Sequence, residues 1–378
     1  MSERHTVYFV PGMFGFGNLA GYDYFHHLRK GLERRYADAG IPVSFEDVPT
    51  PPTSSLRERA RVLATTVGHT TTGSGPIHLV GHSTGGLDGR LVLSPLINLR
   101  LPTGLMGWTR RVRSHVSVNT PHYGTPVASY FATVSGTRVL YALSLLTVVS
   151  LKLGEPSLAI FSRVLAGIGG IDALFGNDLK VFSGITSAVL RFVDRDGRGE
   201  ITEFLSKVQV DQGAIIQISP EAMDLFNAAV ENAEHVRYAS LVSAAPRPAT
   251  MRAARRVRSP YTAFTAALYT TLYQFAAQRH AQYGYAKLDR AALQFVERGI
   301  GRMPTDGDSD GIVPTLSMPW GDLLWAGDGD HLDVIGHFQD EVHPVRHVDW
   351  LTSGSAFSRR EFQQVVDSIA SYQIASAT

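Results

Sequence analysis

Residues 77–91 read IHLVGHSTGGLDGRL and pass from an apolar run through a glycine-rich turn into a helical pattern. The first four residues are typical of a buried strand, and the residues after Ser83 continue with the spacing of a helix. Gly81 and Gly85 lie on either side of the serine, and glycine fits where a larger residue cannot be placed. The stretch therefore predicts a sharp strand–turn–helix that holds Ser83 at its tip.

The composition limits the classes of protein to which the chain can belong. It has 378 residues, 44% of them hydrophobic and 18% charged, which is enough apolar material for a large core in one α/β domain. The formal net charge of +1 lacks the basic excess of nucleic-acid-binding domains. The absence of cysteine excludes disulfides, thiol catalysis and cysteine-ligated metals. We expect a single domain over residues 1–378 without a nucleic-acid partner.

The hydropathy pattern predicts no membrane-spanning segment. The N-terminal sequence MSERHTVYFVPG lacks the apolar region of a signal peptide. The longest apolar run, residues 139–151, is VLYALSLLTVVSL, and its 13 residues are fewer than the roughly 20 that a transmembrane helix needs. The sequence as written predicts a cytoplasmic protein; a secreted protein whose signal had been removed would read the same way.

Short strand-like segments alternate with helical patterns along the chain. The strand-like segments are residues 6–10, 43–48, 77–80, 115–119 and 236–242. Serines that fit the N-cap position precede three helical patterns, at Ser55, Ser219 and Ser358. This alternation predicts an α/β fold with a mostly parallel sheet that helices cover on both faces.

Two stretches interrupt the alternation. Residues 127–215 are apolar and rich in Gly, Ser and Leu, and residues 246–300 contain two helical patterns. Four apolar side chains of the second stretch follow helical spacing: Phe264, Leu268, Leu272 and Phe275. We interpret both stretches as insertions at one edge of the sheet, and these four side chains as core or cap rather than a binding site.

Ser83 has candidate partners near the C-terminus. A serine hydroxyl is a weak nucleophile at neutral pH and needs a base that a third group orients. Where a nucleophilic serine lies at such a strand–turn–helix, the catalytic residues follow one another along the chain as Ser, then Asp or Glu, then His. The stretch TDGDSDGIVPTLSM supplies Asp310, and WAGDGDHLDVIGH supplies His331. Ser83, Asp310 and His331 are therefore a candidate catalytic triad.

Each of these residues also has a structural interpretation. The carboxylates in residues 306–310 also fit a solvated acidic turn or a loose cation cluster. His331 is one of 14 histidines, and two others, His82 and His122, are close to the proposed site in the sequence. His82 would flank Ser83 rather than face it, so we interpret it as structural.

An acyl-transfer intermediate needs two N–H donors around its oxyanion. One is the amide of the residue after the nucleophile, Thr84, which also begins a helix whose dipole favours negative charge. The other is expected in the loop after an early strand, and YFVPGMFGFGN fits because Pro11 and Gly12 let the backbone approach the site. The amides of Met13 and Thr84 are therefore the candidate oxyanion hole.

Together these residues resemble the bacterial triacylglycerol lipases of the α/β-hydrolase superfamily. The matching segments follow the family's order: FVPGMFG, HLVGHSTGGLDGR, VNTPHYGTP, ISPEAMDLFN…VRYAS and SDGIVP…DHLDVIG. The resemblance implies an α/β-hydrolase fold and a lipase or lipase-like carboxylesterase acting on small-molecule or lipid esters. It implies Ser83 as nucleophile, Asp310 as acid and His331 as base.

The resemblance also suggests a calcium site and a lid. Asp333 falls where these lipases have a calcium ligand, and Asp289 is a second candidate ligand; no organic cofactor is implied. A mobile helical lid that meets a lipid–water interface would lie within residues 127–176; the alternative is a buried packing helix. Where the family usually has histidine, this chain has Pro11, which affects the shape of the oxyanion loop.

Three rival functions stay open at this point. An acyltransferase or a polyester hydrolase would use the same triad. GFGNLAG, residues 15–21, follows a strand and hints at the loop of a nucleotide-binding oxidoreductase, but its glycine spacing departs from the usual fingerprint. A catalytically inactive hydrolase fold used for binding is the third, although all three triad positions are filled.

Overall fold

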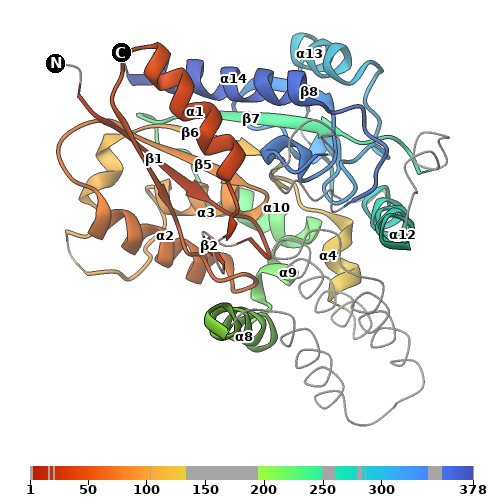
Figure 1. The fold of residues 1–378 in the computed structure, drawn as a ribbon, viewed down its shortest axis with the longest axis horizontal. Helices are drawn as coiled ribbons and strands as arrows, with labels where there is room; N and C mark the ends of the chain where they lie inside the picture. The colour runs from red at the N-terminus through yellow and green to blue at the C-terminus, as the bar shows by residue number, and fades with distance from the viewer. Residues whose placement is uncertain are drawn as a thin grey trace.

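A six-stranded parallel sheet forms the centre of the molecule (Figure 1). The computed structural model describes residues 3–15, 18–19, 22–102, 104–132, 195–248, 260–278, 283–285, 287–338 and 351–377. The strand order is β4-β1-β5-β6-β7-β8, and each neighbouring pair is parallel. The strands are β1 (His5–Val10), β4 (Val43–Asp47), β5 (Ile77–His82), β6 (Val112–Val118), β7 (Arg237–Ala244) and β8 (Asp322–Asp328). The predicted parallel α/β sheet is confirmed.

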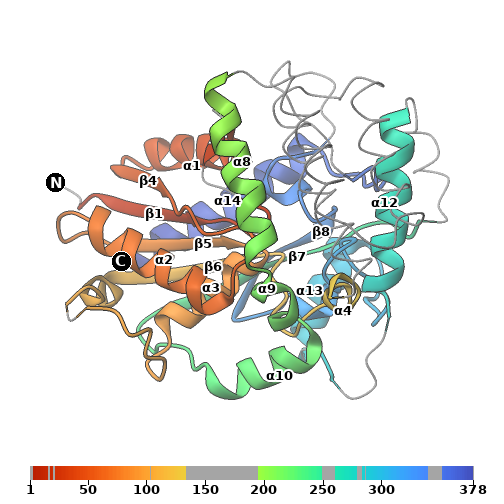
Figure 2. The same cartoon turned by 90° about the horizontal axis from the view of Figure 1, so that it is seen from below.

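Helices cover the sheet on both faces (Figures 1 and 2). On one face α1 (His26–Asp38) packs against α14 (Arg359–Ala377), and on the other α2 (Leu56–Thr70) packs against α3 (Thr84–Leu93). Strand β1 contributes to both layers, because Val7 and Phe9 join the first core and Tyr8 and Val10 the second. This alternation is what a strand buried on both faces requires.

The predicted helix starts lie where the serines indicate. Ser55 Oγ accepts from Glu58 N at 3.3 Å, and α2 begins at the next residue. Ser219 caps α10 (Pro220–Ala229) with Pro220 at its first position, where proline has no amide to lose. The expected buried side chains of α14 are in the core: Phe362, Val365, Val366 and Ile369.

Both predicted insertions are described in part. Residues 127–215 include most of α4 (Pro126–Phe131), α8 (Arg195–Val210) and α9 (Gly213–Gln217). The lid prediction falls mostly on residues 133–194, which lie outside the described residues. Residues 246–300 contain α12 (Pro260–Ala276) and α13 (Arg290–Ile300). In α12, Leu272 is buried, and Leu268 and Phe275 pack against the same apolar cluster, as expected of a core or cap helix.

The remaining described elements are short strands and 3-10 helices in the connections between these strands and helices. They are β2 (Asn18–Leu19), β3 (Tyr22–Asp23), η1 (Gly107–Arg111), η3 (Thr315–Ser317) and η4 (Asp333–Ile335). Strands β2 and β3 form a short antiparallel pair. Among the helices that the structure describes, none combines the length and apolar character needed to span a bilayer.

Four of the buried histidines lie within or beside the sheet and have a pKa that burial lowers strongly: His78, His82, His115 and His122. Their polar partners include Ser114 Oγ, 2.8 Å from His78 Nδ1, and the Gly86 carbonyl, 2.8 Å from His115 Nε2. Burial lowers the pKa of His78 to about 3 and that of His115 to about 4. It lowers the pKa of His82 and His122 well below the ordinary value. All four are therefore neutral in the folded protein at neutral pH.

These histidines predict a loss of stability in mild acid. Below pH about 6.5 the unfolded chain protonates them while the folded protein does not, so stability falls as the pH decreases towards 4. Each histidine adds about 1.4 kcal/mol per pH unit to that slope. Thermal unfolding between pH 7.5 and 5 measures it, and His115→Gln should flatten the slope whereas the exposed His69→Gln should not. A melting temperature independent of pH over this range would contradict the prediction.

Candidate active site

The turn between β5 and α3 holds Ser83 in a strained backbone conformation, with φ 53° and ψ −127°. Ser83 itself adopts the positive φ. The glycines on either side of it are needed because strand and helix come too close together there for a side chain. A Cβ at Gly81 would lie 2.4 Å from Gly86 N, and one at Gly85 would lie 2.1 Å from Val10 O. Strand and helix can approach this closely only because both positions lack a side chain. Such strain in a non-glycine residue is typical of a functional site.

Asp310 and His331 form a buried pair beyond the carboxyl ends of β7 and β8. His331 Nδ1 lies 2.6 Å from Asp310 Oδ2. The other carboxylate oxygen accepts from Ile312 N at 2.9 Å and Val313 N at 2.7 Å, so the carboxylate cannot rotate freely. An ionised carboxylate only accepts hydrogen bonds, which assigns the proton of the neutral imidazole to Nδ1 and leaves Nε2 as a base.

The same segment lies against the Ser83 turn. The rings of His331 and His82 are 4.7 Å apart, and His82 directly precedes the serine. Within the described residues the Ser83 hydroxyl makes no hydrogen bond. Transfer of its proton to His331 therefore requires the two side chains to come closer than they are in this structure. Catalytic hydrogen bonds often tighten only in the substrate complex.

The loop after β1 supplies backbone amides beside Ser83. Phe14 N donates to Pro52 O at 2.9 Å, and Gly15 N donates to Gly12 O at 3.0 Å. The amides of Met13 and Thr84 donate to no group in the part of the chain that the structure describes. Both predicted oxyanion donors are therefore available to a ligand.

A buried ion pair fixes this loop, and no sequence pattern indicates it. Arg59 in α2 contacts Asp88 in α3 at 2.7 Å, and both side chains are fully buried. The same guanidinium donates to Pro11 O at 2.6 Å. Arg59 therefore joins two helices to the loop that presents Met13 N, and only the tertiary contact reveals this role.

Gly12→Ala tests how closely the loop approaches the serine. A Cβ at Gly12 would lie 2.6 Å from Ser83 Cβ, so the loop or the serine must move. A displaced loop would no longer present Met13 N, and losing one oxyanion donor usually lowers kcat by about 10²–10³-fold. Gly107→Ala is the matched control, because a Cβ there meets nothing within 4 Å. Full activity in the Gly12 variant would exclude the loop from the site.

Solved structures share this architecture. EstA from Clostridium botulinum matches with a TM-score of 0.51 and 16% identity, over 98% of this chain and 88% of that one. The Staphylococcus hyicus lipase matches with a TM-score of 0.50 and 15% identity, over 99% and 97% of the two chains. The fold is that of the α/β-hydrolases. No protein-family model matches the sequence, and no curated protein does.

In open α/β sheets, ligands bind beyond the carboxyl ends of the strands, and the candidate residues lie at that edge here. Ser83 follows β5, Met13 follows β1, and His331 follows β8. Asp310 N and O also bond to backbone groups of Val313 and His331, which fixes the loop around the acid. Residues far apart in the sequence therefore meet at one edge.

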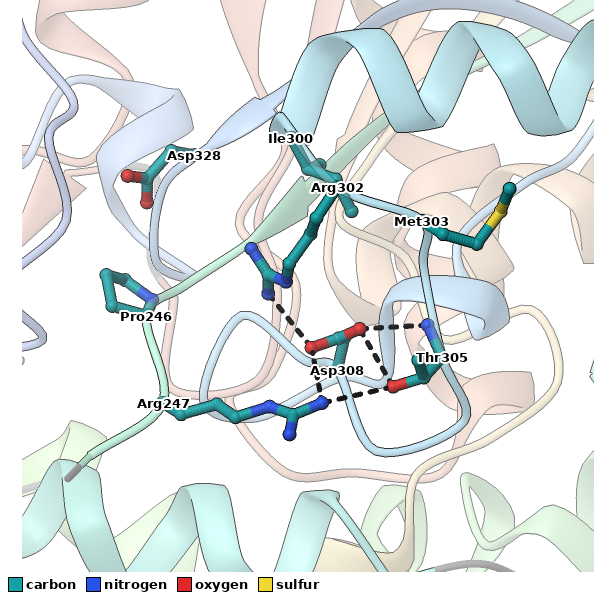
Figure 3. A pocket seen from close by; sticks show the side chains of 8 residues that line it. All are labelled: Pro246, Arg247, Ile300, Arg302, Met303, Thr305, Asp308 and Asp328. Carbon is teal, nitrogen blue, oxygen red and sulfur yellow. Dashed lines mark hydrogen bonds and ion pairs between the residues drawn. The ribbon is translucent and has the colours of Figure 1, made fainter. Parts of the chain in front are cut away.

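The acidic loop is neither a solvated turn nor a cation cluster (Figure 3). Asp308 is fully buried and accepts from Arg302 Nη2 at 2.9 Å, from Arg247 Nη2 at 3.5 Å and from Thr305 N at 2.8 Å. Burial acts to raise the pKa of Asp308, but these donors outweigh it and hold the pKa below its ordinary value. Asp308 and its three partners line a pocket of about 550 Å³.

His122 has a structural environment. Its ring stacks on Trp320 with centroids 5.2 Å apart, and its Nδ1 lies 3.3 Å from Arg90 Nη1. The Arg90 guanidinium lies 3.4 Å from the centroid of the Trp320 ring. This stack joins α3, the loop after β6 and the segment before β8. It leaves His331 as the histidine paired with a carboxylate at the Ser83 turn.

The two candidate calcium ligands serve other contacts in this structure. Asp289 is exposed and caps α13 by accepting from Ala292 N at 2.8 Å. Asp333 is buried and accepts from Asp330 N at 2.8 Å and Ser355 Oγ at 2.7 Å. No group of three or more His, Asp or Glu residues in the described ranges is placed to hold a metal ion. The two carboxylates do not fit a shared site, and calcium binding stays a prediction.

The GFGNLAG stretch does not lead into a helix. Asn18 and Leu19 form β2, which pairs with β3, and α1 begins only at His26. A dinucleotide loop needs a helix N-terminus for the pyrophosphate directly after its glycines. The geometry therefore disfavours the oxidoreductase.

Proposed function

We propose that this protein is a serine hydrolase that cleaves carboxylic esters, either a lipase or a lipase-like carboxylesterase. The observation that carries the proposal is the buried Asp310–His331 pair packed beside Ser83 at a positive-φ turn. Both solved structures share the fold, and one of them is named as a lipase.

The chemistry would follow from the roles of these groups. His331 Nε2 takes the proton of Ser83 as Oγ attacks the ester carbonyl, and the oxyanion accepts from the amides of Met13 and Thr84. The C–O bond breaks, and the leaving alkoxide takes the proton from His331. Water then attacks the acyl-enzyme with the same base, which releases the acid. Asp310 holds the Nδ1–H tautomer and stabilises the imidazolium.

An active-site fluorophosphonate tests the proposal directly. The reagent should form one adduct, located on Ser83 by peptide mass spectrometry, and abolish hydrolysis of p-nitrophenyl esters. Heat-unfolded protein is the control, because labelling must depend on the folded site. Absence of an adduct, or an adduct on another serine, would overturn the proposal. A series of esters from two to sixteen carbons would then give the acyl-chain preference.

We also propose that residues 127–176 form the lid suggested by their apolar composition. A lid with an apolar face would be stabilised in its open form by a lipid surface. The rate on a sparingly soluble ester should therefore rise abruptly when droplets form, and the rate on a freely soluble short ester should not. Smooth saturation through the solubility limit would contradict the lid.

A further inference from the structure

His82 bridges two parts of the site that are far apart in the sequence. Its Nε2 lies 2.8 Å from the carbonyl oxygen of His331, and its Nδ1 lies 2.8 Å from Tyr24 Oη. The side chain is 1% exposed and is the last residue of β5. Both ring nitrogens are thus used inside the protein, on opposite sides of the ring.

These partners determine the tautomer of His82. A backbone carbonyl only accepts hydrogen bonds, so Nε2 carries the proton and donates it to His331 O. Nδ1 must then accept, and the Tyr24 hydroxyl donates to it. Burial first, and the nearby His331 and His337 next, lower the pKa of His82 well below its ordinary value, so the ring is neutral. The result is a directed chain from Tyr24 through His82 to the backbone of His331.

This chain links the nucleophile to the base. Ser83 follows His82 in the backbone, and its amide donates to Val118 O at 2.9 Å, which fixes the turn on β6. His331 N donates to Asp310 O at 3.1 Å, so the bond from His82 restrains the other side of the same residue. One side chain therefore connects the backbone of the candidate nucleophile to the backbone of the candidate base.

We infer that His82 is a positioning residue of the proposed reaction, acting through its Nε2–H bond to the His331 carbonyl. The inference rests on the proposed function and goes beyond it, because His82 takes no part in proton transfer. A displacement of about 1 Å between reacting groups can cost about 10²-fold in rate. A neutral ring at this place also leaves the imidazolium formed on His331 without a like charge 4.7 Å away.

Two substitutions of His82 test the Nε2–H hydrogen bond separately from the other contacts of the ring. In Gln the side-chain amide nitrogen reaches the place of Nε2, whereas in Asn it reaches only that of Nδ1. His82→Asn should lower kcat by about 10²-fold with KM within about twofold of the wild type. His82→Gln should recover most of that loss. Tyr24→Phe leaves the His331 carbonyl to hold the tautomer of His82 but removes the hydrogen bond that Nδ1 accepts, and it should lower kcat by about fivefold.

Melting temperatures, kcat and KM are measured for all three variants and, for comparison, for Ser83→Ala. These measurements distinguish a positioning role from a purely structural one. Recovery by Gln but not by Asn supports the inference. Wild-type kcat in His82→Asn, equal losses in Asn and Gln, or a change confined to KM would each overturn it while Ser83-dependent hydrolysis stands. A wild-type protein without Ser83-dependent hydrolysis would instead overturn the proposed function, and the positioning role with it.

Discussion

Ser83→Ala is expected to lower kcat for ester hydrolysis by about 10⁶-fold, since the variant cannot form the acyl-enzyme. The residual rate over water would come from the oxyanion donors and substrate binding alone. KM should change little, because the hydroxyl acts on the reacting carbonyl rather than on the rest of the substrate. Purified variant and wild type are compared on one p-nitrophenyl ester, with fluorophosphonate labelling as the second readout.

The same variant should fold normally. The Ser83 hydroxyl makes no hydrogen bond within the described residues, so its removal leaves no buried partner unsatisfied. Alanine occupies the positive-φ position with the same Cβ as serine, and the backbone strain is unchanged. The melting temperature should therefore match that of the wild type and of Ser74→Ala, a surface control. A variant that retains more than about one hundredth of the activity would remove Ser83 from the mechanism.

Local patterns were sufficient to predict the frame of the molecule. Apolar runs place five strands close to their observed bounds, and the capping serines mark the starts of α2, α10 and α14. These signals work because they report interactions within a few residues along the chain. The parallel sense of the sheet then follows from the alternation of strands and helices, whereas the strand order is known only from the structure.

Long-range polar contacts could not be predicted in the same way. Arg59 and Asp88 are ordinary helix residues in the sequence, and their pairing depends on how α2 packs against α3. Asp308 reads as part of an acidic turn until Arg302 and Arg247 are seen to surround it. Spacing along one helix or strand carries no information about a partner on another element.

The pairing of Asp310 with His331 lies between these cases. Chain order and the polar loops predict both residues, but not the amides of Ile312 and Val313 that fix the carboxylate. Chain order alone leaves the choice among Asp306, Asp308 and Asp310 open, and the family resemblance selects Asp310. The structure resolves this, since Asp308 faces the arginines and Asp310 faces His331.

Asp310→Asn should lower kcat by about 10⁴-fold, the second-largest effect we expect. The loop amides from Ile312 and Val313 hold one oxygen of this side chain, so the amide nitrogen of the introduced asparagine would point at His331 Nδ1. Nδ1 would then have to accept, and the proton would move to Nε2, where the base is needed. The variant keeps the shape of the site but reverses the tautomer of His331. Measurements of kcat over a pH series give the loss of activity.

Asp308→Asn is the matched control, the same chemical change two residues earlier in one loop. Its carboxylate accepts from Arg302, Arg247 and Thr305, none of which touches His331. Loss of that charge should reduce the free energy of unfolding by about 2 kcal/mol and leave the tautomer of His331 unaffected. We therefore expect Asp308→Asn to lower the melting temperature far more than kcat, and Asp310→Asn to do the reverse. Equal kinetic losses in the two variants would mean that the loop matters only for its shape, and that the carboxylate of Asp310 is not what orients the base.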